Sequence, residues 1–482
     1  MKDSLELKIY PLYLNGEWFT SDVTLPVINP ANGEAFARIS IVERDRVAQA
    51  VTDAQAAFAK WKNLPGVARG QFLERVAAEV ERRREEMARL ITLENGKPLT
   101  QSLGEVTMTT DHLRWFAAEA RRAYGRSIPS QVESKRHLVV KTPIGVVGAI
   151  SPWNFPLALA VRKIAPAWAA GCPVVLKPAR QTPLSAVVFA ECAATAQLPK
   201  GVFQVVVGSA ADIGEEFLTN PNCRKITFTG STEVGKGLIA GAARQVKPLS
   251  LELGGQAPVL VFEDADLPRA VEQTLLAKFR NTGQSCIAAN RIYLQRSIYD
   301  RFLESFTARV KALKVGDGLE PGVEIGPLID EAAVAKASAH VEDALARGAR
   351  LVCGGHRVQR TGYFFEPTIL VDVPPEALCF CEETFAPVAA ICRFESEAEA
   401  IGLANASLFG LSAYAFTQDL SRTFRLMESL EAGTISINDG LPTVSHAPFG
   451  GVKQSGWGRE LGSEGLDAFL ETKHISIGLS PS

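Results

Sequence analysis

The segment 249–291 holds two side chains whose chemistry suits covalent catalysis. Glu252 is followed by Gly254 and Gly255, and glycine lets a strand end abruptly and point its last side chain into a cleft. Cys286 follows Gly283 in a polar loop, which favours a reachable thiol. A thiolate attacks carbonyl carbons, and a carboxylate activates the water that later releases the acyl group. Taken alone, however, a single Cys is more often a core residue, and a Glu before glycines is usually a solvated turn residue.

The elements that would position these side chains alternate between strands and helices. Short apolar strands separated by helices indicate βαβ units and a parallel sheet. The predicted strands are 146–150, 174–177, 203–207, 225–229 and 259–262, and the predicted helices lie near 157–170, 184–196, 211–218 and 233–243. Ligands bind at the carboxyl ends of such strands, which here are followed by 151–154, 177–180, 208–209 and 230–231.

The rest of the chain has other patterns. Residues 12–40 predict short strands, and apolar side chains spaced along Val51–Trp61 and Leu73–Met87 predict one helix each, before a third over 103–124. Residues 290–440 predict a second α/β region.

Two polar, strand-like segments lie at 137–141 and 474–478. Polar strands outside a core often pair with something else. We therefore expect them to contact a partner subunit in a homo-oligomer.

A glycine-rich loop from Gly230 to Lys236 follows a predicted strand and opens a helix, as a phosphate-binding loop requires. Gly237 replaces the hydroxyl residue that would hold Mg²⁺ in a nucleotide hydrolase. We therefore interpret the loop as the binding site of a dinucleotide pyrophosphate, although no Gly-x-Gly-x-x-Gly fingerprint follows the predicted strands.

Composition limits the function classes. A chain of 482 residues predicts two or three domains, and a net charge of −2 argues against nucleic-acid binding. The N-terminus resembles neither a signal nor a transit peptide, and the apolar stretch 164–176 is too short to span a membrane. Eight Cys without regular spacing indicate reduced thiols in the cytoplasm. Cys379 and Cys381 have no second ligand pair, so we expect no metal.

Seven short motifs occur along nearly the whole chain: Pro152–Pro156, Lys177–Pro178, Phe228–Ser231, Leu251–Gly255, Gly283–Cys286, Glu382–Phe385 and Pro448–Gly456. In this order they resemble the motif series of the aldehyde dehydrogenase superfamily, and the chain is most similar to the succinate-semialdehyde dehydrogenases. The resemblance implies an α/β fold with a Rossmann-type cofactor domain (1–121 and 145–255, with part of 447–465), a catalytic domain (256–446) and a small β oligomerisation arm (122–144 and 466–482).

The resemblance implies three catalytic roles. Cys286 would be the nucleophile and Glu252 the general base, while Asn154 and the Cys286 backbone N–H would form the oxyanion hole. Relatives that transfer the acyl group to coenzyme A typically lack this Glu, so we expect hydrolysis to the free acid.

The resemblance also assigns the cofactor site. Its residues would be Trp153, Asn154, Lys177, Gly230, Ser231, Leu253, Glu383 and Phe385. Where NAD-preferring members often have Glu, this chain has Arg180, whose guanidinium suits a 2′-phosphate. We therefore expect NADP to be preferred, with NAD as the alternative. Lys177, Glu383 and Arg180 also fit plain surface roles.

The residues assigned to the substrate have more alternative roles than the catalytic residues. Arg162 and Arg280 match the two arginines that hold a distal carboxylate, and either also fits a structural ion pair. The family's hydroxyl near this site corresponds to Ser445 or Thr443, or is displaced. The prediction is an ω-carboxylated semialdehyde as substrate. The alternatives are another aliphatic or aromatic aldehyde, or a non-catalytic binding protein. Ala288 occupies a position where many members have a second Cys, so no disulfide switch is expected.

Overall fold

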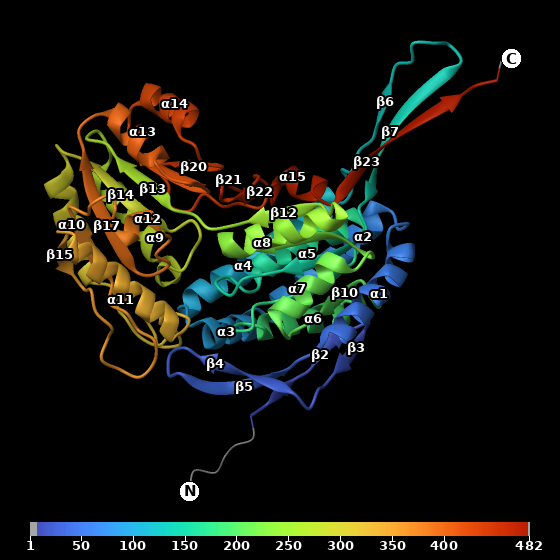
Figure 1. Cartoon of the computed structure of the whole chain (residues 1–482), viewed down its shortest axis with the longest axis horizontal. Helices are drawn as coiled ribbons and strands as arrows, with labels where there is room; N and C mark the ends of the chain where they lie inside the picture. Colours follow the sequence, from blue (N-terminus) through green and yellow to red (C-terminus); the bar gives the residue numbers. More distant parts are fainter. Residues whose placement is uncertain (1–6, 481–482) are drawn as a thin grey trace, which may run out of the picture.

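A computed structural model describes residues 7–480. Its central layer is a six-stranded sheet with strand order β10-β9-β8-β11-β12-β22, parallel except for β22 (Figure 1). The strands are β8 (Val146–Ile150), β9 (Val174–Lys177), β10 (Phe203–Val205), β11 (Cys223–Thr229), β12 (Leu249–Glu252) and β22 (Gly456–Trp457). The first four strands predicted from the sequence are confirmed, with shifts of at most two residues at their ends.

The strand order creates a switch point between β8 and β11. From β8 the chain moves outward to β9 and β10, and then returns to add β11 and β12 on the other side. Because parallel connections are right-handed, the first two crossover helices lie on one face and the next two on the other. The carboxyl ends of β8 and β11 therefore open a crevice for ligands. The crossover helices are α5 (Ala158–Ala170), α6 (Leu184–Thr195), α7 (Ala210–Thr219) and α8 (Thr232–Ala242), as predicted.

Four N-terminal helices add a further layer: α1 (Arg44–Trp61), α2 (Gly66–Arg82), α3 (Arg84–Asn95) and α4 (Leu99–Glu119). Helices α2 and α4 pack on α5, and α1 packs on β8 to β10. The single helix predicted across Leu73–Met87 was wrong: it divides at Arg83, which is non-helical and pairs with Glu86 and Glu191. The third helix begins earlier than predicted, directly after Pro98, and ends five residues earlier.

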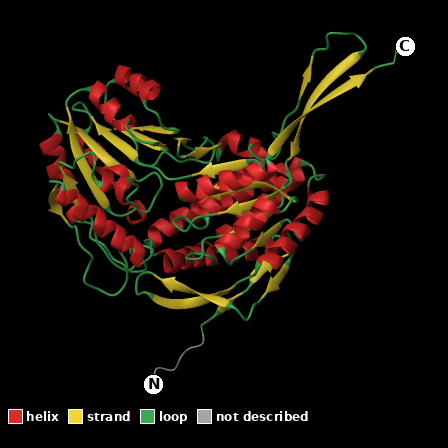
Figure 2. Ribbon diagram, viewed as in Figure 1, coloured by secondary structure: helices red, strands yellow, loops and turns green. Residues whose placement is uncertain are grey.

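A second sheet has seven strands in the order β15-β16-β17-β14-β13-β19-β20, parallel except for β15. Its strands are β13 (Ala257–Val261), β14 (Ala289–Gln295), β15 (Arg350–Cys353), β16 (Thr368–Val371), β17 (Val388–Phe394), β19 (Ser412–Phe416) and β20 (Thr434–Ile437). Its helices are α9 (Leu267–Phe279), α10 (Tyr299–Lys311), α11 (Glu331–Ala346), α12 (Leu378–Cys381), α13 (Glu397–Asn405) and α14 (Leu420–Ser429). The strand predicted at 259–262 thus belongs to this sheet, because the chain crosses over at Gly254 and Gly255. Figure 2 shows helices around both sheets.

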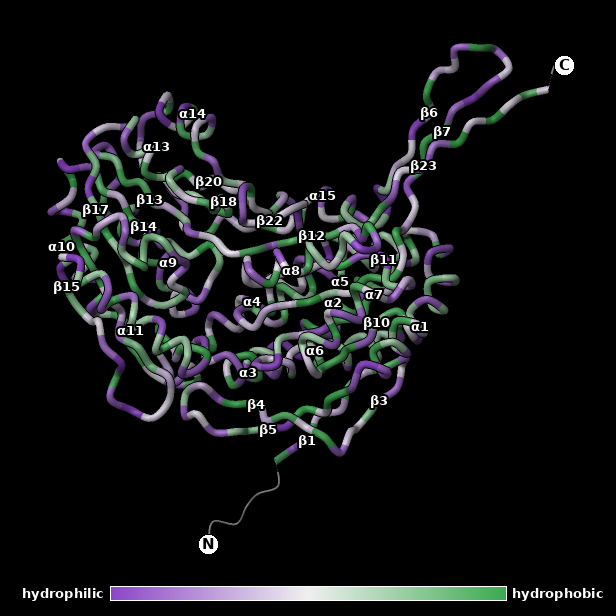
Figure 3. The backbone as a smooth tube through the Cα atoms, in the orientation of Figure 1, coloured by the Kyte–Doolittle hydropathy of each residue, from purple (hydrophilic) through white to green (hydrophobic). Residues whose placement is uncertain are grey.

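A three-stranded antiparallel arm projects from the body (Figure 1). It consists of β6 (Arg126–Ile128), β7 (Lys135–Pro143) and β23 (Leu470–Gly478), so the two strand-like segments pair with each other. Most of its residues are exposed on both faces, unlike the apolar strands of the two sheets (Figure 3). No helix among residues 7–480 has the length and apolar character needed to cross a bilayer.

The remaining short elements cover the edges of the body. Strands β1 (Ile9–Tyr10), β4 (Thr24–Asn29) and β5 (Glu34–Ser40) form one small sheet, and β2 (Leu12–Leu14) and β3 (Glu17–Phe19) form a hairpin. Strand β18 (Phe409–Gly410) pairs with β21 (Val452–Lys453), and α15 (Gly462–Asp467) precedes the arm. The predicted short strands over 12–40 are confirmed, whereas the domain boundaries stay a prediction.

Candidate active site

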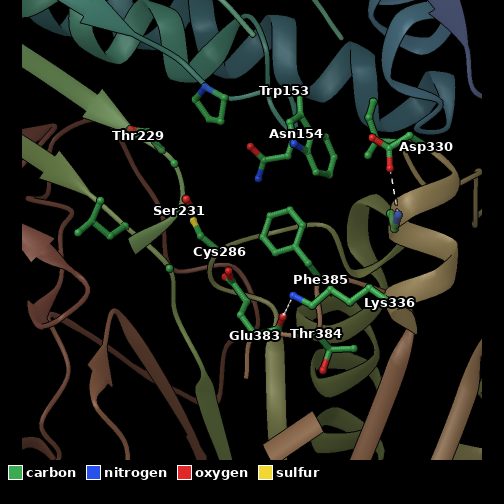
Figure 4. A pocket seen from close by; sticks show the side chains of 16 residues that line it. Trp153, Asn154, Thr229, Ser231, Cys286, Asp330, Lys336, Glu383, Thr384 and Phe385 are labelled. Atoms are coloured by element: carbon green, nitrogen blue, oxygen red, sulfur yellow. Dashed lines mark hydrogen bonds between the residues drawn. The ribbon is translucent and has the colours of Figure 1, made fainter. Parts of the chain in front are cut away.

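A cavity of about 310 Å³ lies beyond the carboxyl ends of β8, β11 and β12 (Figure 4). Eight residues assigned from the sequence line it: Trp153, Asn154, Gly230, Ser231, Leu253, Cys286, Glu383 and Phe385. The sequence analysis had not assigned the others: Pro152, Thr229, Gly254, Ile329, Asp330, Ala333, Lys336 and Thr384. Six assigned residues do not line this cavity, namely Glu252, Lys177, Arg180, Arg162, Arg280 and Ser445.

Cys286 is presented by a tightly constrained loop. Asn281, Thr282 and Gly283 have φ values of 51°, 58° and 74°, a left-handed run that is costly for the first two residues. Glycine is required at 283, because a Cβ there would lie 2.3 Å from the backbone oxygen of Ala386. The side chain of Gln284 anchors the loop by accepting a hydrogen bond of 2.9 Å from the Ile329 N–H. The thiol is therefore held in a defined place on the cavity wall.

Asn154 is buried and positioned through its backbone. Its carbonyl oxygen accepts hydrogen bonds from Lys97 Nζ (2.7 Å) and Asn281 Nδ2 (2.8 Å), while its own Nδ2 donates to the Gln284 carbonyl (3.2 Å). Lys97 in turn forms an ion pair of 2.6 Å with Glu105, and both side chains are fully buried. Lys97 and Asn281 thus fix the amide that the sequence analysis assigned to the oxyanion hole.

Sequence reasoning missed this support because Lys97 and Asn281 lie far from Asn154 in the sequence. Glu105 also accepts hydrogen bonds from the N–H groups of Leu157 and Ala158 at the start of α5. Glu105 gave a signal, since it is a charged residue at a position of α4 that helical periodicity turns inward.

Glu252 ends β12, as expected, and is only 4 % exposed. Within residues 7–480, one of its carboxyl oxygens has no hydrogen-bond partner. Burial raises the pKa of this carboxyl well above its ordinary value, and the neighbouring Glu460 raises it further, while Lys163 opposes the shift. Lys163 pairs with Glu460 and donates to Thr229 Oγ1 at 2.6 Å. In the chain, Glu252 directly precedes Leu253 and Gly254, which line the cavity.

The other ionisable groups of the cavity are also shifted by burial. Burial raises the pKa of Cys286 to about 12, with a further contribution from the Glu383 carboxylate and an opposing one from Arg162. Burial likewise raises the pKa of Glu383 to about 7, although its carboxylate accepts a hydrogen bond from the Gly255 N–H at 3.2 Å. Both groups are therefore held toward their neutral forms.

The loop that carries Glu383 and Phe385 forms the wall opposite Asn154 (Figure 4). Lys336 donates a hydrogen bond to the Glu383 carbonyl. Phe385 has a φ of 56°, and its ring meets Trp153 edge to face at 5.5 Å between centroids. A bulky residue with positive φ marks backbone strain, which structures keep where a side chain must take one orientation.

Lys177 and Arg180 follow the neighbouring strand end. Burial lowers the pKa of Lys177, and the positive charge of Arg180 lowers it further. Arg180 is exposed and lines a second cavity of about 310 Å³, which shares Ile329 and Asp330 with the first. The two cations thus lie together beside the main cavity.

Arg162 and Arg280, the two arginines assigned to the substrate, lie close enough for their charges to interact, and each packs against a different aromatic ring. Arg162 is 5 % exposed and lies 5.0 Å from the Phe449 ring. Arg280 lies 5.0 Å from the Phe155 ring. Between residues 7 and 480, neither guanidinium forms an ion pair, and the role of each arginine in binding the substrate stays a prediction. Ser445 is buried, with its hydroxyl bonded to other side chains.

No group of three or more His, Cys, Asp or Glu side chains in the described part of the chain has the arrangement of a metal site. The reactive groups at the cavity or beside it are the thiol of Cys286, the amide of Asn154, the carboxyl groups of Glu252 and Glu383 and the guanidinium groups of Arg162 and Arg280.

Comparison with known proteins identifies the chemistry. A model described as "Aldehyde dehydrogenase family" matches residues 18–475. The chain is 49% identical over 468 residues to succinate-semialdehyde dehydrogenase [NADP(+)] GabD of Escherichia coli and 48% identical over 468 residues to a glutarate-semialdehyde dehydrogenase of Pseudomonas aeruginosa, each match covering 97% of both chains. It is 47% identical over 480 residues to a 3-sulfolactaldehyde dehydrogenase of Pseudomonas putida, covering 99% of both chains.

A solved structure gives the same result. The crystal structure of an NADP dependent enzyme of E. coli superposes with a TM-score of 0.97 at 48% sequence identity, covering 99% of this chain and 100% of the other. The α/β fold expected from the motifs is confirmed.

Proposed function

The chain belongs to the aldehyde dehydrogenase family, and from this premise we propose that it oxidises a small aldehyde with a negative charge at the end remote from the carbonyl, such as succinate semialdehyde. The observation that carries this proposal is the pair of buried or partly buried guanidinium groups, Arg162 and Arg280, that form no ion pair within residues 7–480, although Glu460 and Glu105 act on their charges from farther away. A buried cation without a counter-ion is costly. An anionic substrate would supply the missing charge.

The proposed reaction uses three side chains. Cys286 must first lose the proton that burial retains on its thiol; the thiolate then attacks the aldehyde carbon, and the Asn154 amide stabilises the negative charge that develops on the carbonyl oxygen. A bound nicotinamide dinucleotide would accept the hydride as the adduct becomes a thioester. Glu252, in its ionised form, then takes a proton from water, whose oxygen attacks the thioester carbon; the C–S bond breaks, and the acid and the Cys286 thiolate are released.

Several features of the cavity suit this cofactor. Trp153 and Phe385 provide aromatic walls beside Cys286, and Ser231 caps the N-terminus of α8, where backbone N–H groups favour a pyrophosphate. Gly230 keeps the approach open, since a Cβ there would lie 2.4 Å from the Phe228 ring. We assign Lys177, Leu253 and Glu383 to the same site.

An aldehyde panel tests the substrate assignment. We expect succinate semialdehyde to be oxidised with a far higher kcat/KM than butanal, and Arg280→Leu to reduce that preference by about 10-fold or more, the loss of one hydrogen bond to a charged group. Butanal, which has no carboxylate, is the control substrate for the unaltered enzyme and for Arg280→Leu. Equal kcat/KM values for the two aldehydes in the unaltered enzyme would refute the proposal.

A sulfonated three-carbon aldehyde is the second candidate, because one relative that spans almost the whole chain is a 3-sulfolactaldehyde dehydrogenase. A guanidinium group pairs with a sulfonate as well as with a carboxylate. Including this aldehyde in the same panel separates the two candidates by their kcat/KM values.

We further propose NADP as the preferred cofactor, because Arg180 is an exposed cation at the place where a 2′-phosphate would lie beside Lys177. Exchange of Arg180 for Glu should lower the ratio of kcat/KM for NADP to that for NAD. An unchanged ratio would exclude the role of Arg180.

The arm of β6, β7 and β23 supports a homo-oligomer. Its exposed apolar side chains include Ile128, Leu138 and Ile477, and its outer edges are unpaired in the single chain. Sedimentation velocity should show a species larger than a monomer at micromolar concentration, and a monomer would contradict this assignment.

A further inference from the structure

A chain of hydrogen bonds extends from Arg162 to the surface through side chains with no role in the reaction. Arg162 Nε lies 3.2 Å from Nε2 of His112, and Nδ1 of His112 lies 2.7 Å from Ser445 Oγ. Ser445 Oγ also bonds Asp111 Oδ2. His112 is fully buried on α4, whereas Asp111 is exposed on the same helix. The chain joins three segments that are far apart in the sequence.

The direction of each hydrogen bond in this chain follows from the first donor. A guanidinium group only donates, so His112 Nε2 must carry a lone pair and accept from Arg162. The imidazole is then neutral with its proton on Nδ1, from which it donates to Ser445 Oγ. The Ser445 hydroxyl proton is left to bond the Asp111 carboxylate. Burial, together with the positive charge of Arg162, lowers the pKa of His112 well below its ordinary value, which agrees with a neutral ring.

A neutral acceptor has a specific advantage at this position. A carboxylate on Arg162 Nε would orient the guanidinium equally well, but it would cancel most of the positive charge in a buried place. The imidazole instead fixes one edge of the guanidinium and leaves the charge intact. Asp111 is the final acceptor in this series of hydrogen bonds. Two neutral side chains, Ser445 and His112, separate its carboxylate from Arg162.

The other direct contacts of the Arg162 guanidinium are with a thioether and an aromatic ring. Its terminal nitrogen approaches the Met108 sulfur at 3.9 Å, and its guanidinium carbon lies 5.0 Å from the Phe449 ring. Met108 also packs against the cluster of Phe155, Ala158 and Leu159 near the start of α5. His112 is therefore the one strong hydrogen-bond acceptor of this guanidinium among the described residues, while the carboxylates that act on its charge, Glu460, Glu252 and Glu105, form no ion pair with it.

We propose that His112 is a positioning residue for substrate specificity: as a neutral acceptor held by Ser445 and Asp111, it directs the Arg162 guanidinium toward the anionic end of the aldehyde without neutralising it. This inference rests on the proposed function, since it requires an anionic substrate. Ser445 would then support His112 and would not bind the substrate directly, because its hydroxyl group is hydrogen-bonded to His112 and Asp111.

Substitution of His112 tests the proposal. His112→Phe retains a ring of similar shape but removes the acceptor, whereas His112→Gln retains an acceptor at a similar reach. We expect His112→Phe to raise KM for succinate semialdehyde by about 10-fold or more, as expected for a lost hydrogen bond to a charged group. The kcat/KM for butanal should change by less than about 2-fold, and His112→Gln should recover most of the lost preference.

Two variants along the chain of hydrogen bonds keep the test independent of the folding of His112→Phe. Ser445→Ala and Asp111→Asn should each weaken the preference for the anionic aldehyde by about 3-fold, because they act on His112 from a distance. Arg114→Gln, exposed on the same helix, is the matched control and should leave both substrates unaffected.

Each outcome separates the two proposals. Failure of the unaltered enzyme to prefer the anionic aldehyde refutes the proposed function, and the role of His112 with it. A preference that survives in all of the His112, Ser445 and Asp111 variants leaves the proposed function standing but overturns the role of His112. Equal losses for succinate semialdehyde and butanal, without recovery in His112→Gln, would mean that His112 only supports the fold.

Discussion

The reactivity of Cys286 in the free enzyme should be much lower than that of an ordinary thiol. Burial raises its pKa from the ordinary 9.0 to about 12, so near neutral pH its thiolate fraction is roughly one thousandth of that of an unperturbed cysteine. Because the thiolate is the nucleophile, we expect alkylation by iodoacetamide to be slower by about the same factor than alkylation of free cysteine in the same solution.

The rate of alkylation of Cys286 should increase with pH. With a pKa near 12, the alkylation rate should rise about tenfold for each pH unit between 7 and 10, without a plateau. Mass spectrometry of the peptide that contains Cys286 measures this rate directly. A plateau below pH 9 would refute the reasoning, because it would mean that the thiol is already ionised there.

Two substitutions test how neighbouring charges contribute to the pKa of Cys286. The Glu383 carboxylate raises the pKa of Cys286 and Arg162 lowers it. Glu383→Gln should therefore accelerate alkylation, chiefly above pH 7, because the pKa of Glu383 is itself raised to about 7 and its charge is present only above that pH. Arg162→Gln should slow alkylation. The opposite order would contradict the assignment of these charges.

Three further predictions concern other parts of the site. Asn154→Ala should lower kcat by about 10²- to 10³-fold, as for the loss of one oxyanion donor; a normal kcat in steady-state assays would exclude that role. Glu105→Gln leaves the ammonium of Lys97 buried without its counter-charge and should lower the free energy of unfolding by about 3–5 kcal/mol, measured by urea denaturation, with an unchanged midpoint as the contrary result. Since Ala288 offers no second thiol, peroxide inactivation should not involve a Cys286 disulfide, which peptide mapping under non-reducing conditions would reveal.

Much of the fold could be predicted because its signals are local. Apolar strands such as 146–150 and 174–177 are buried on both faces, so each is an unbroken apolar run in the sequence. The break at Arg83 was missed because both flanking helices keep their apolar side chains on a compatible face. The sheet to which 259–262 belongs was not predicted, because the sequence of one strand does not specify the strands with which it pairs.

The sequence by itself determined which groups can react: the thiol of Cys286, the carboxyl of Glu252 and the amide of Asn154 are properties of residue type, and glycines beside them mark where the chain can turn. Only the tertiary structure decided how these groups are supported and charged. Lys97 reaches the Asn154 carbonyl, and His112 reaches Arg162, through contacts between segments far apart in the chain. Burial and neighbouring charge, which set the protonation of a thiol or carboxyl group and leave a guanidinium without a counter-ion, exist only once those segments have packed together.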